Sequence, residues 1–479
     1  MIELFLSIQR SKGNMKKTVI VYGELENALQ KRALCELTEI LLDYSLDYPI
    51  CISYDKMTPE KDTRYIYLGT SASNPYVKAH TKSPTLPESY SVSVKDDTVI
   101  IEGADDAGVL YGALDFYNKY VVKFEHPETD EYVTNIFSKD TLPDFEISEA
   151  PSVRERGLWS WGHVIYDYRG YFDNMLKLKM NSVIIWNDFV PANARDIVEY
   201  AHACNIKIYW GFSWLWDVDC LKCDLSKLDG ESEKILKKYE AEYRDTGADG
   251  IYFQTFTETK QDNIKGILIA DAASRFVNKT AEMFFKKYPD ITLQFGLHAS
   301  SVKNRLEFIE RVDPRIHIIW EDCGAFPFSY VPTDLEDFDG TMELVHHASH
   351  LRGEGERFGV VTKGLVKLDW TSFEHLRGSQ CIGVSSRAVK ENRIARKKRI
   401  WRYIQAAWLA NADRALEAVR GMCRAKNGDL PVFALVEDGM FEENIMYPVA
   451  LYSEMLWNAD GDVKEITKNV AMRSYVTFA

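Results

Sequence analysis

Residues 156–457 repeat one pattern eight times: a short apolar segment, then a longer segment with apolar residues at helical spacing. The short segments are rich in β-branched and aromatic residues, which is typical of strands buried on both faces of a parallel sheet. The predicted strands are residues 157–161, 182–188, 206–214, 249–258, 291–298, 315–322, 358–370 and 432–438. Eight such strand–helix units predict an α/β fold of the (β/α)8 TIM-barrel type.

The segments between these strands predict helices over 170–180, 193–204, 225–246, 271–288, 301–312, 335–351, 388–424 and 443–457. An open doubly wound sheet is the alternative arrangement for alternating strands and helices. That fold usually carries a glycine-rich phosphate loop after its first strand, and none appears after residue 161. The barrel is therefore the favoured architecture.

A smaller α/β pattern precedes the barrel. Strands are predicted at 17–23 and 64–70, a hairpin over 90–103, and helices over 26–45 and 105–121, the second capped by Asp105. The polar, proline-containing residues 141–156 read as a connector. The predicted organisation is therefore an N-terminal extension (1–15), a small α/β domain (16–150) and the barrel (151–479).

Composition narrows the range of partners. The net charge of −14 argues against nucleic acid or an anionic membrane as the main partner, because either would require a basic face. No segment approaches the roughly 20 apolar residues of a membrane span, and the N-terminus has no typical signal sequence. The scattered cysteines, with one isolated CxxC at Cys220 and Cys223, suit a reducing compartment. We expect a cytoplasmic protein without a cofactor or metal; an oligomer stays possible.

The strand ends carry the candidate chemistry. In such barrels the catalytic residues come from the carboxyl ends of the strands. Here those ends combine carboxylates with tryptophans, whereas HExxH, GxSxG and P-loop motifs are absent. The residues are Trp159, Trp161, Trp186, Asn187, Asp188, Trp210, Trp214, Trp216, Glu258, His298, Trp320, Glu321, Asp322, Lys363, Lys367, Asp369, Trp370, Glu437 and Asp438.

Carboxylates with aromatic walls are what glycosidic bond cleavage requires. One carboxylic acid protonates the leaving oxygen, and a second carboxylate activates water or attacks the sugar. Glu258 is the predicted acid, because Tyr252 and Phe256 on its own strand offer an apolar setting that holds its proton. Glu321, alone or with Asp322, is the predicted base.

Aromatic rings cover the flat C–H faces of sugars, so the remaining strand-end residues are predicted to bind substrate. They are Trp159, Trp161, Trp186, Asn187, Trp214, His298, Trp320, Lys363, Asp369 and Glu437. For a uronate, Lys363, Lys367 or Arg156 could pair with the sugar carboxylate. The competing interpretation is structural: acidic residues at strand ends often cap helices, and tryptophans often fill a core.

Residues 90–120, YSVSVKDDTVIIEGADDAGVLYGALDFYNKY, resemble the α/β domain that precedes the barrel in β-N-acetylhexosaminidases and α-glucuronidases. Hexosaminidases end their fourth strand with Asp-Glu, whose Asp orients the substrate acetamido group. Thr257-Glu258 instead is similar to the Ser-Glu of α-glucuronidases. This resemblance implies that Glu258 is the general acid and that Glu321, Asp322 or Asp369 supplies the base.

A second similarity lies in residues 450–469, ALYSEMLWNADGDVKEITKN, which resemble the end of the α-glucuronidase barrel, with Ala459 where proline is usual. In those enzymes a helical domain follows, whereas this sequence ends at Ala479. We therefore expect a divergent, exo-acting glycoside hydrolase resembling α-glucuronidases. The alternatives are a hexosaminidase-like enzyme, a non-catalytic carbohydrate-binding barrel, and a metal-dependent barrel hydrolase or lyase using Asp188, His298 and Glu321.

Overall fold

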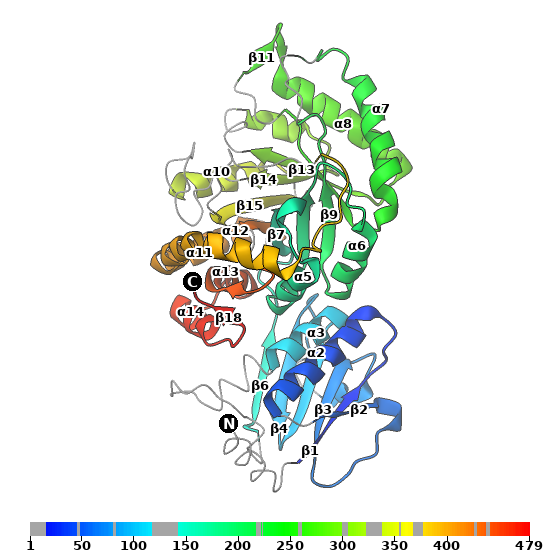
Figure 1. Cartoon of the computed structure of the whole chain (residues 1–479), viewed down its shortest axis with the longest axis vertical. Coiled ribbons are helices and arrows are strands. Elements are labelled where there is room, and N and C mark those ends of the chain that lie inside the picture. Colours follow the sequence, from blue (N-terminus) through cyan, green and yellow to red (C-terminus); the bar gives the residue numbers. More distant parts are fainter. Residues whose placement is uncertain are drawn as a thin grey trace. The chain divides into compact units, whose positions relative to one another are not determined.

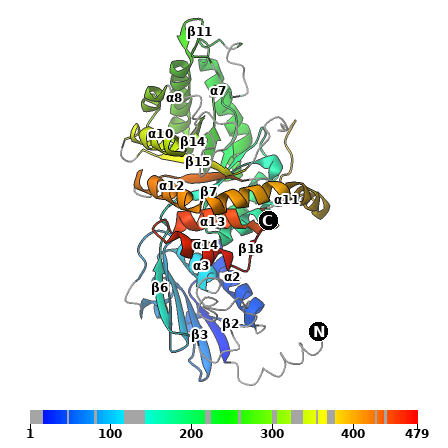
Figure 2. The same ribbon diagram turned by 90° about the vertical axis from the view of Figure 1, so that its left-hand side faces the viewer.

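The computed structural model forms two compact units, Met1–Pro151 and Ser152–Ala479 (Figures 1 and 2). The residues that it describes are 16–45, 48–79, 83–116, 142–216, 222, 224–256, 261–298, 305–321, 338–353, 356–366, 377–425, 429–436 and 441–479. The predicted N-terminal extension, residues 1–15, lies outside this set.

The first unit is built on a six-stranded mixed sheet in the order β2-β1-β3-β5-β4-β6. Its strands are β1 (Lys17–Tyr22), β2 (Ile50–Ser53), β3 (Thr63–Thr70), β4 (Tyr90–Lys95), β5 (Thr98–Gly103) and β6 (Phe145–Glu149). Helices α2 (Ala28–Ser45) and α3 (Asp106–Asp115) pack against each other over the sheet (Figure 1). The small α/β fold predicted before the barrel is confirmed.

Local sequence explains two turns of this unit. Asp96 and Asp97 both have positive φ, the backbone that a tight two-residue hairpin requires between β4 and β5. Asp105 caps α3 by accepting a hydrogen bond from Gly108 N at 2.8 Å, as predicted. The connector prediction was wrong for β6, which pairs antiparallel with the edge of β4. β6 forms a strand because its backbone hydrogen-bonds to β4. The sequence of this short segment does not show that pairing.

The second unit is a closed barrel with the strand order β7-β8-β9-β10-β13-β14-β15-β16. Neighbouring strands are all parallel, so the predicted TIM barrel is confirmed and the open doubly wound sheet is excluded. The barrel strands are β7 (Arg156–Trp161), β8 (Ser182–Trp186), β9 (Lys207–Gly211), β10 (Gly250–Phe253), β13 (Thr292–His298), β14 (His317–Glu321), β15 (Phe358–Leu365) and β16 (Val432–Val436). Two small pairs accompany them: β11 (Asn263–Ile264) with β12 (Ile267–Leu268), and β17 (Ile445–Met446) with β18 (Val476–Thr477).

The helices of this unit mostly follow the predicted alternation. They are α5 (Tyr168–Lys177), α6 (Ala194–Ala203), α7 (Asp229–Lys238), α8 (Ile269–Lys287), α10 (Phe338–His350), α11 (Arg387–Ala410), α12 (Ala412–Ala425), α13 (Tyr447–Trp457) and α14 (Val463–Ala471). The single helix predicted over 388–424 is in fact two. Asn411 separates them: its side chain donates to Ala407 O, and its carbonyl starts α12 by accepting from Ala415 N. Of the helix predicted over 301–312, the described part is a 3-10 helix at Leu306–Arg311.

Strand alternation decides what the barrel encloses. Successive side chains of a strand point to opposite faces, so every second residue of each barrel strand points inward. The interior cluster consists of Trp159, Trp161, Ile184, Trp186, Tyr209, Tyr252, Ile319, Val361, Val366, Phe433 and Leu435. This parity fixes which strand-end residues can face the mouth of the barrel.

Candidate active site

Glu321, the last residue of β14, is buried at the centre of a polar cluster drawn from four neighbouring strands. Its Oε1 accepts hydrogen bonds from the Tyr252 hydroxyl at 2.5 Å and from the Gln254 side-chain amide. Gln254 Nε2 also donates to the Tyr252 hydroxyl oxygen at 2.9 Å. On the other side, Oε2 lies 3.4 Å from His298 Nε2 and 3.3 Å from Lys363 Nζ. The structure therefore brings together three predicted site residues, Glu321, His298 and Lys363.

The surroundings of Glu321 set its charge. Burial acts to raise the pKa of its carboxyl, but the charges of His298 and Lys363 and the hydrogen bonds from Tyr252 and Lys363 outweigh burial and leave the pKa below its ordinary value. Burial and the Glu321 charge hold the pKa of Tyr252 well above its ordinary value. At neutral pH the carboxylate is therefore ionised and the tyrosine is a fixed donor. An ionised carboxylate can act as a base or nucleophile, not as the proton donor.

Gly296 makes room for this arrangement. It faces inward from β13, and a Cβ atom placed on it would overlap the Tyr252 hydroxyl. A glycine inside a strand often marks such a close approach. Sequence reasoning missed Gly296, placed Gln254 at the end of its strand without giving it a role, and assigned Tyr252 to Glu258 rather than to Glu321. The parity of β10 and the glycine in an otherwise bulky strand were the available signals.

An aromatic wall adjoins the cluster. The Trp159 and Trp161 rings meet edge to face with centroids 4.5 Å apart, and Trp159 and Trp186 each lie 5.9 Å from the Tyr252 ring. Trp186 also meets Trp216 at 5.7 Å. The predicted substrate-binding residues Trp159, Trp161 and Trp186 thus share the inner face of the barrel with Tyr252.

Asn187 follows the end of β8 and is almost completely buried. Its amide nitrogen donates to Phe189 O. Within the part of the chain that the structure describes, its Oδ1 has no hydrogen-bond partner. This oxygen is buried and lies beside Gly162, where a Cβ atom would come within 2.9 Å of it.

Two predicted sugar-binding tryptophans lie on the wrong face of the strands. Trp214 is fully buried, stacked on Phe253 at 3.6 Å and on Phe284 of α8 at 5.4 Å. Trp320 is fully buried near Phe358, with ring centroids 6.2 Å apart. Because Trp320 precedes the inward-facing Glu321 by one residue, it must point outward. Both side chains belong to the packing outside the barrel and not to a sugar platform.

Arg156 is also unavailable to a substrate carboxylate. It begins β7 at the amino end of the barrel, is fully buried, and donates to the backbone carbonyls of Val153, Arg154 and Lys179. Its guanidinium also lies over the Trp457 ring. The amino and carboxyl ends of parallel strands lie at opposite ends of a barrel, so Arg156 is far from the mouth.

Several predicted residues lie outside the described part of the chain. They are Glu258, Asp322, Asp369 and Glu437, together with Cys220, Cys223, Thr257, Lys367, Trp370 and Asp438. The carboxylate that faces Glu321 therefore stays a prediction. Among the described residues, no three His, Cys, Asp or Glu side chains gather as metal ligands, and Lys363 Nζ occupies a position beside Glu321 Oε2.

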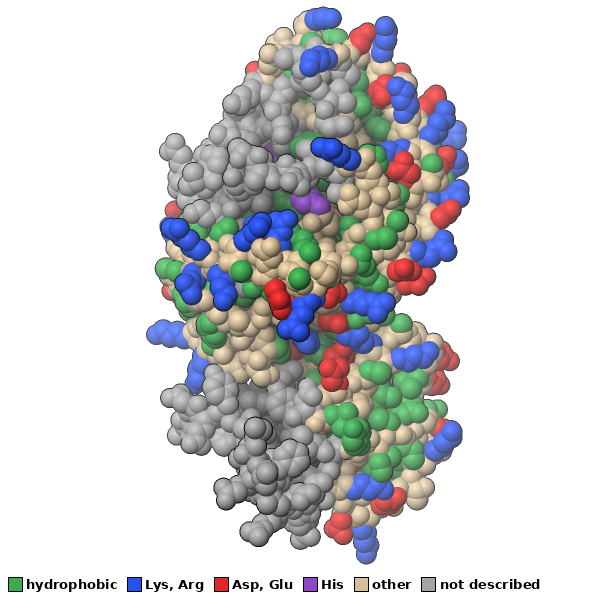
Figure 3. Space-filling model, viewed as in Figure 1, with side chains coloured by type: hydrophobic (Ala, Val, Ile, Leu, Met, Phe, Trp, Pro, Cys, Tyr) green, Lys and Arg blue, Asp and Glu red, His purple; other side chains and the backbone are tan. Residues whose placement is uncertain are grey.

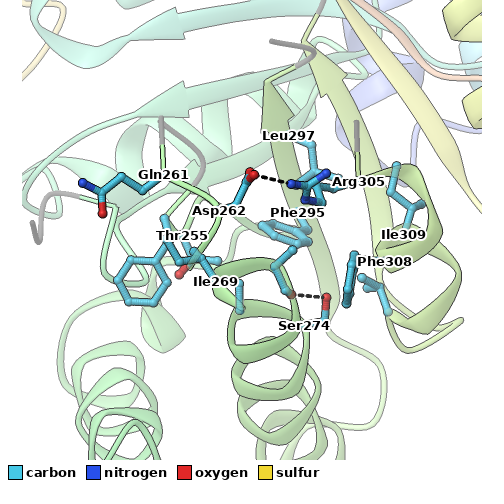
Figure 4. A pocket seen from close by; sticks show the side chains of 14 residues that line it. Thr255, Gln261, Asp262, Ile269, Ser274, Phe295, Leu297, Arg305, Phe308 and Ile309 are labelled. Carbon is cyan, nitrogen blue, oxygen red and sulfur yellow. Dashed lines mark hydrogen bonds and ion pairs between the residues drawn. The ribbon is translucent and has the colours of Figure 1, made fainter. Parts of the chain in front are cut away.

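A pocket lies beside the barrel rather than inside it (Figure 4). Phe295 and Leu297, which point outward from β13, line it together with residues of α8, and an ion pair joins Arg305 to Asp262 at 2.5 Å. The Ser274 hydroxyl in this pocket is bonded to a helix carbonyl. Its mainly apolar wall does not contain the paired carboxylates that glycoside chemistry needs.

Known proteins resemble this chain in structure but not detectably in sequence. No protein-family profile and no curated protein sequence matches it. Solved structures do match. A GH138 enzyme targeting the pectin rhamnogalacturonan II has a TM-score of 0.53 and 12% identity over 94% of this chain and 65% of its own. CpGH84B has a TM-score of 0.54 and 12% identity over 95% and 70%.

A third match is a family GH115 4-O-methyl-α-glucuronidase with specificity for decorated arabinogalactans. Its TM-score is 0.53, with 14% identity over 95% of this chain and 59% of its own. The chain thus spans 59–70% of these three proteins. At such low identity the similarity shows a shared fold, which is that of barrel proteins from glycoside hydrolase families. In the described part of the chain, no helix is both long and apolar enough to cross a membrane.

Proposed function

We propose that this chain is a glycoside hydrolase whose reaction takes place at the carboxyl ends of the barrel strands. The observation that carries the proposal is the ionised Glu321 carboxylate, held on the inner wall of the barrel next to Trp159 and Trp186. Structural relatives named as GH138 and GH115 enzymes support the same class of reaction. The proposed enzyme is exo-acting and similar to α-glucuronidases.

In this proposal Glu321 is the base or nucleophile and Glu258 the general acid. Tyr252 and Gln254 fix the orientation of Glu321 through Oε1, while His298 and Lys363 keep it ionised. Two carboxyl groups with these opposite protonation states are the minimum that glycoside hydrolysis requires. The distance between them, which determines retention or inversion, depends on Glu258.

Substrate recognition follows from the same wall. Trp159, Trp161 and Trp186 line the inner wall with 4%, 7% and 5% of their surface exposed, and we propose that a sugar packs its C–H face against the edge of this wall at the barrel mouth. A uronate carboxylate would approach Lys363, which would then contact both the substrate and Glu321. An acidic sugar is the substrate class that we propose, with Lys363, now buried and paired with Glu321, as the cation for its carboxylate.

A carbohydrate-binding barrel without catalysis is the second candidate. The observation in its favour is that both oxygens of Glu321 already contact protein groups. A carboxylate held in such a network could serve only to order the pocket. In that case the barrel would bind sugars and release no product.

The deciding experiment is a hydrolysis screen on aryl glycosides, aryl uronides and aryl N-acetylhexosaminides. Replacing Glu321 by Gln removes the charge but keeps the shape, so we expect kcat to fall by about 10²–10⁴-fold while sugar binding persists. Glu258→Gln should cause a comparable loss. Glu282→Gln, an exposed change on α8, is the matched control and should leave turnover intact.

Two results would contradict the proposal. Near-normal turnover in Glu321→Gln would remove this residue from the reaction. Sugar binding by calorimetry, combined with no hydrolysis of any substrate in the screen, would favour the non-catalytic barrel.

A further inference from the structure

Helix α11 carries a charge opposite to that of the rest of the chain. Residues 387–402 contain eight Lys and Arg and a single Glu, a net charge of +7 in a protein whose total is −14. Figure 3 shows Lys and Arg side chains gathered along this helix. The remainder of the chain is therefore strongly acidic, and the positive charge is concentrated in one helical segment.

The first half of α11 has no buried side chains. No residue from Arg387 to Ile400 is buried, and burial begins with Trp401, Ile404 and Trp408. A helix normally buries an apolar stripe along its length. This segment instead presents polar and cationic side chains around most of its circumference, so packing against the barrel does not explain its composition.

The start of the helix is anchored by some of its cations. Lys390 Nζ pairs with Asp167 at 3.0 Å and with Glu443 at 2.5 Å. The Arg393 guanidinium lies over the Tyr166 ring. These contacts explain the roles of Lys390 and Arg393. They do not explain why the next two turns of the helix also carry cations.

The cations of those two turns face solvent. Arg396, Lys398, Arg399 and Arg402 are exposed, and within the described part of the chain none of them has a carboxylate partner. Arg396, Arg399 and Arg402 follow one another at three-residue spacing, and Lys398 precedes Arg402 by four residues, so these side chains lie along the solvent-exposed half of the helix. Tyr403 lies on the same face and is 48% exposed. We call these five residues the basic face.

The segment just before α11 contacts the mouth of the barrel, and the basic face follows about 13 Å further along the helix. Just before α11, Gly383 N donates to Ile165 O, Tyr168 N donates to Gly383 O, and Ser385 N donates to Tyr166 O. Residues 165–168 follow the carboxyl end of β7, the end that carries Trp161. Gly383 has a φ of +67°, and a Cβ atom there would overlap Tyr168. A glycine-dependent junction therefore ties the helix to the rim of the candidate active site.

We propose that the basic face binds the chain of an anionic polysaccharide whose terminal sugar enters the barrel mouth. This inference rests on the proposed glycoside hydrolase function and names its substrate class. Arg396, Arg399 and Arg402 rise about 4.5 Å per step along the helix axis, a spacing comparable to the length of one sugar ring. A polyuronate carries one carboxylate per ring, and Tyr403 offers an aromatic surface to a sugar face.

The acidic remainder of the chain favours this partner over other polyanions. Duplex DNA and anionic membranes present dense charge over a wide surface, which the surrounding carboxylates would repel. A single polysaccharide chain needs only a narrow basic strip. The same reasoning predicts that binding weakens as salt rises, because the contacts are exposed.

The test compares two variants that each lose four positive charges. The first replaces Arg396, Lys398, Arg399 and Arg402 by Gln. The control replaces four other exposed helix lysines by Gln: Lys237, Lys286, Lys464 and Lys468. The probes are polygalacturonate, neutral xylan, duplex DNA and phosphatidylserine vesicles, with binding measured by calorimetry and affinity electrophoresis at low salt.

We expect the wild-type chain to bind polygalacturonate more tightly than xylan. The loss of four exposed charge contacts predicts that the first variant binds polygalacturonate about tenfold more weakly, or weaker still. The control variant should bind like the wild type. Turnover of a small aryl glycoside should be unchanged in the first variant, because no residue of the basic face belongs to the Glu321 cluster.

Equal polygalacturonate affinity in the first variant and the wild type would overturn the proposal. Tighter binding to DNA or vesicles than to polygalacturonate, lost in the first variant, would overturn the assignment of the partner. Glu321→Gln separates the two proposals, because it should keep polysaccharide binding while losing turnover. Polysaccharide binding that depends on the basic face, without hydrolysis of any glycoside, would support the proposed binding site and contradict the proposed hydrolase activity.

Discussion

The inner and outer faces of the barrel wall use the same residue type for different purposes. On the inner face, Trp159 and Trp186 surround Tyr252 beside an ionised carboxylate. On the outer face, Trp214 and Trp320 lie fully buried against aromatic residues outside the barrel. The comparison teaches that position along the strand says little about function until the direction of the side chain is known.

The largest predicted loss of stability comes from a substitution on the outer face of the barrel. Trp214→Ala leaves a cavity between Phe253 and Phe284, which closely packed surroundings cannot fill. We expect a loss of about 3–5 kcal/mol in the free energy of unfolding, measured by denaturant titration. Sugar affinity of the remaining folded protein should be unchanged. A stable Trp214→Ala protein that no longer binds sugar would reverse the assignment of the two faces.

A smaller loss is expected from Gly296→Ala on the inner face. The added methyl group overlaps the Tyr252 hydroxyl, so the tyrosine must move away from Glu321. Such overpacking costs about 1–3 kcal/mol, and turnover should fall at the same time. Combining it with Tyr252→Phe should give less than the sum of the two separate effects, because both act through one contact. Strict additivity would show that Gly296 and Tyr252 act independently.

Trp161→Ala tests a tryptophan on the inner face of the barrel. Trp161 lies at the carboxyl end of β7 and keeps 7% of its surface exposed, whereas Trp214 is fully buried. We expect it to cost less stability than Trp214→Ala but to weaken sugar binding by about tenfold, the value of one aromatic contact. Calorimetry with the best substrate of the hydrolysis screen measures this, and Trp161→Phe should restore most of the affinity.

The smallest effect is a shift in pH dependence. The Tyr252 hydrogen bond helps to lower the pKa of Glu321, so Tyr252→Phe should raise that pKa. A base is active when ionised, and a higher pKa means that it becomes protonated at higher pH. The acid limb of kcat/KM should therefore move to higher pH. The measurement is the pH profile of kcat/KM for the wild type and for Tyr252→Phe. An acid limb at the same or a lower pH in the variant would mean that a group other than Glu321 controls that limb.

Much of the fold could be read from the sequence because its signals are local. The eight apolar strands and the Asp105 cap depend on neighbouring residues and were predicted correctly. The break at Asn411 and the edge strand β6 were missed. The break depends on a hydrogen bond from Asn411 to a helix carbonyl, and β6 depends on hydrogen bonds to β4. The spacing of apolar residues shows neither of these contacts.

The candidate site was only partly predictable. Glu321, His298 and Lys363 were named because strand ends face the barrel mouth, and the structure brings them together. The roles of Gln254 and Gly296 were missed because they depend on atoms of neighbouring strands. Trp320 was misplaced because strand-end position was used without the alternation that turns it away from Glu321.

The sequence by itself determined the class of fold and the stock of residues at the strand ends, because hydrophobic period and turn chemistry act over a few residues. The tertiary structure decided which of those residues meet. Barrel closure sets the register that turns Glu321 toward Tyr252 and Trp320 toward the outside. It also brings residues 165–168 against residues 383–385, which places the start of the cationic helix near the rim. These pairings join segments distant in sequence, so only the folded chain specifies them.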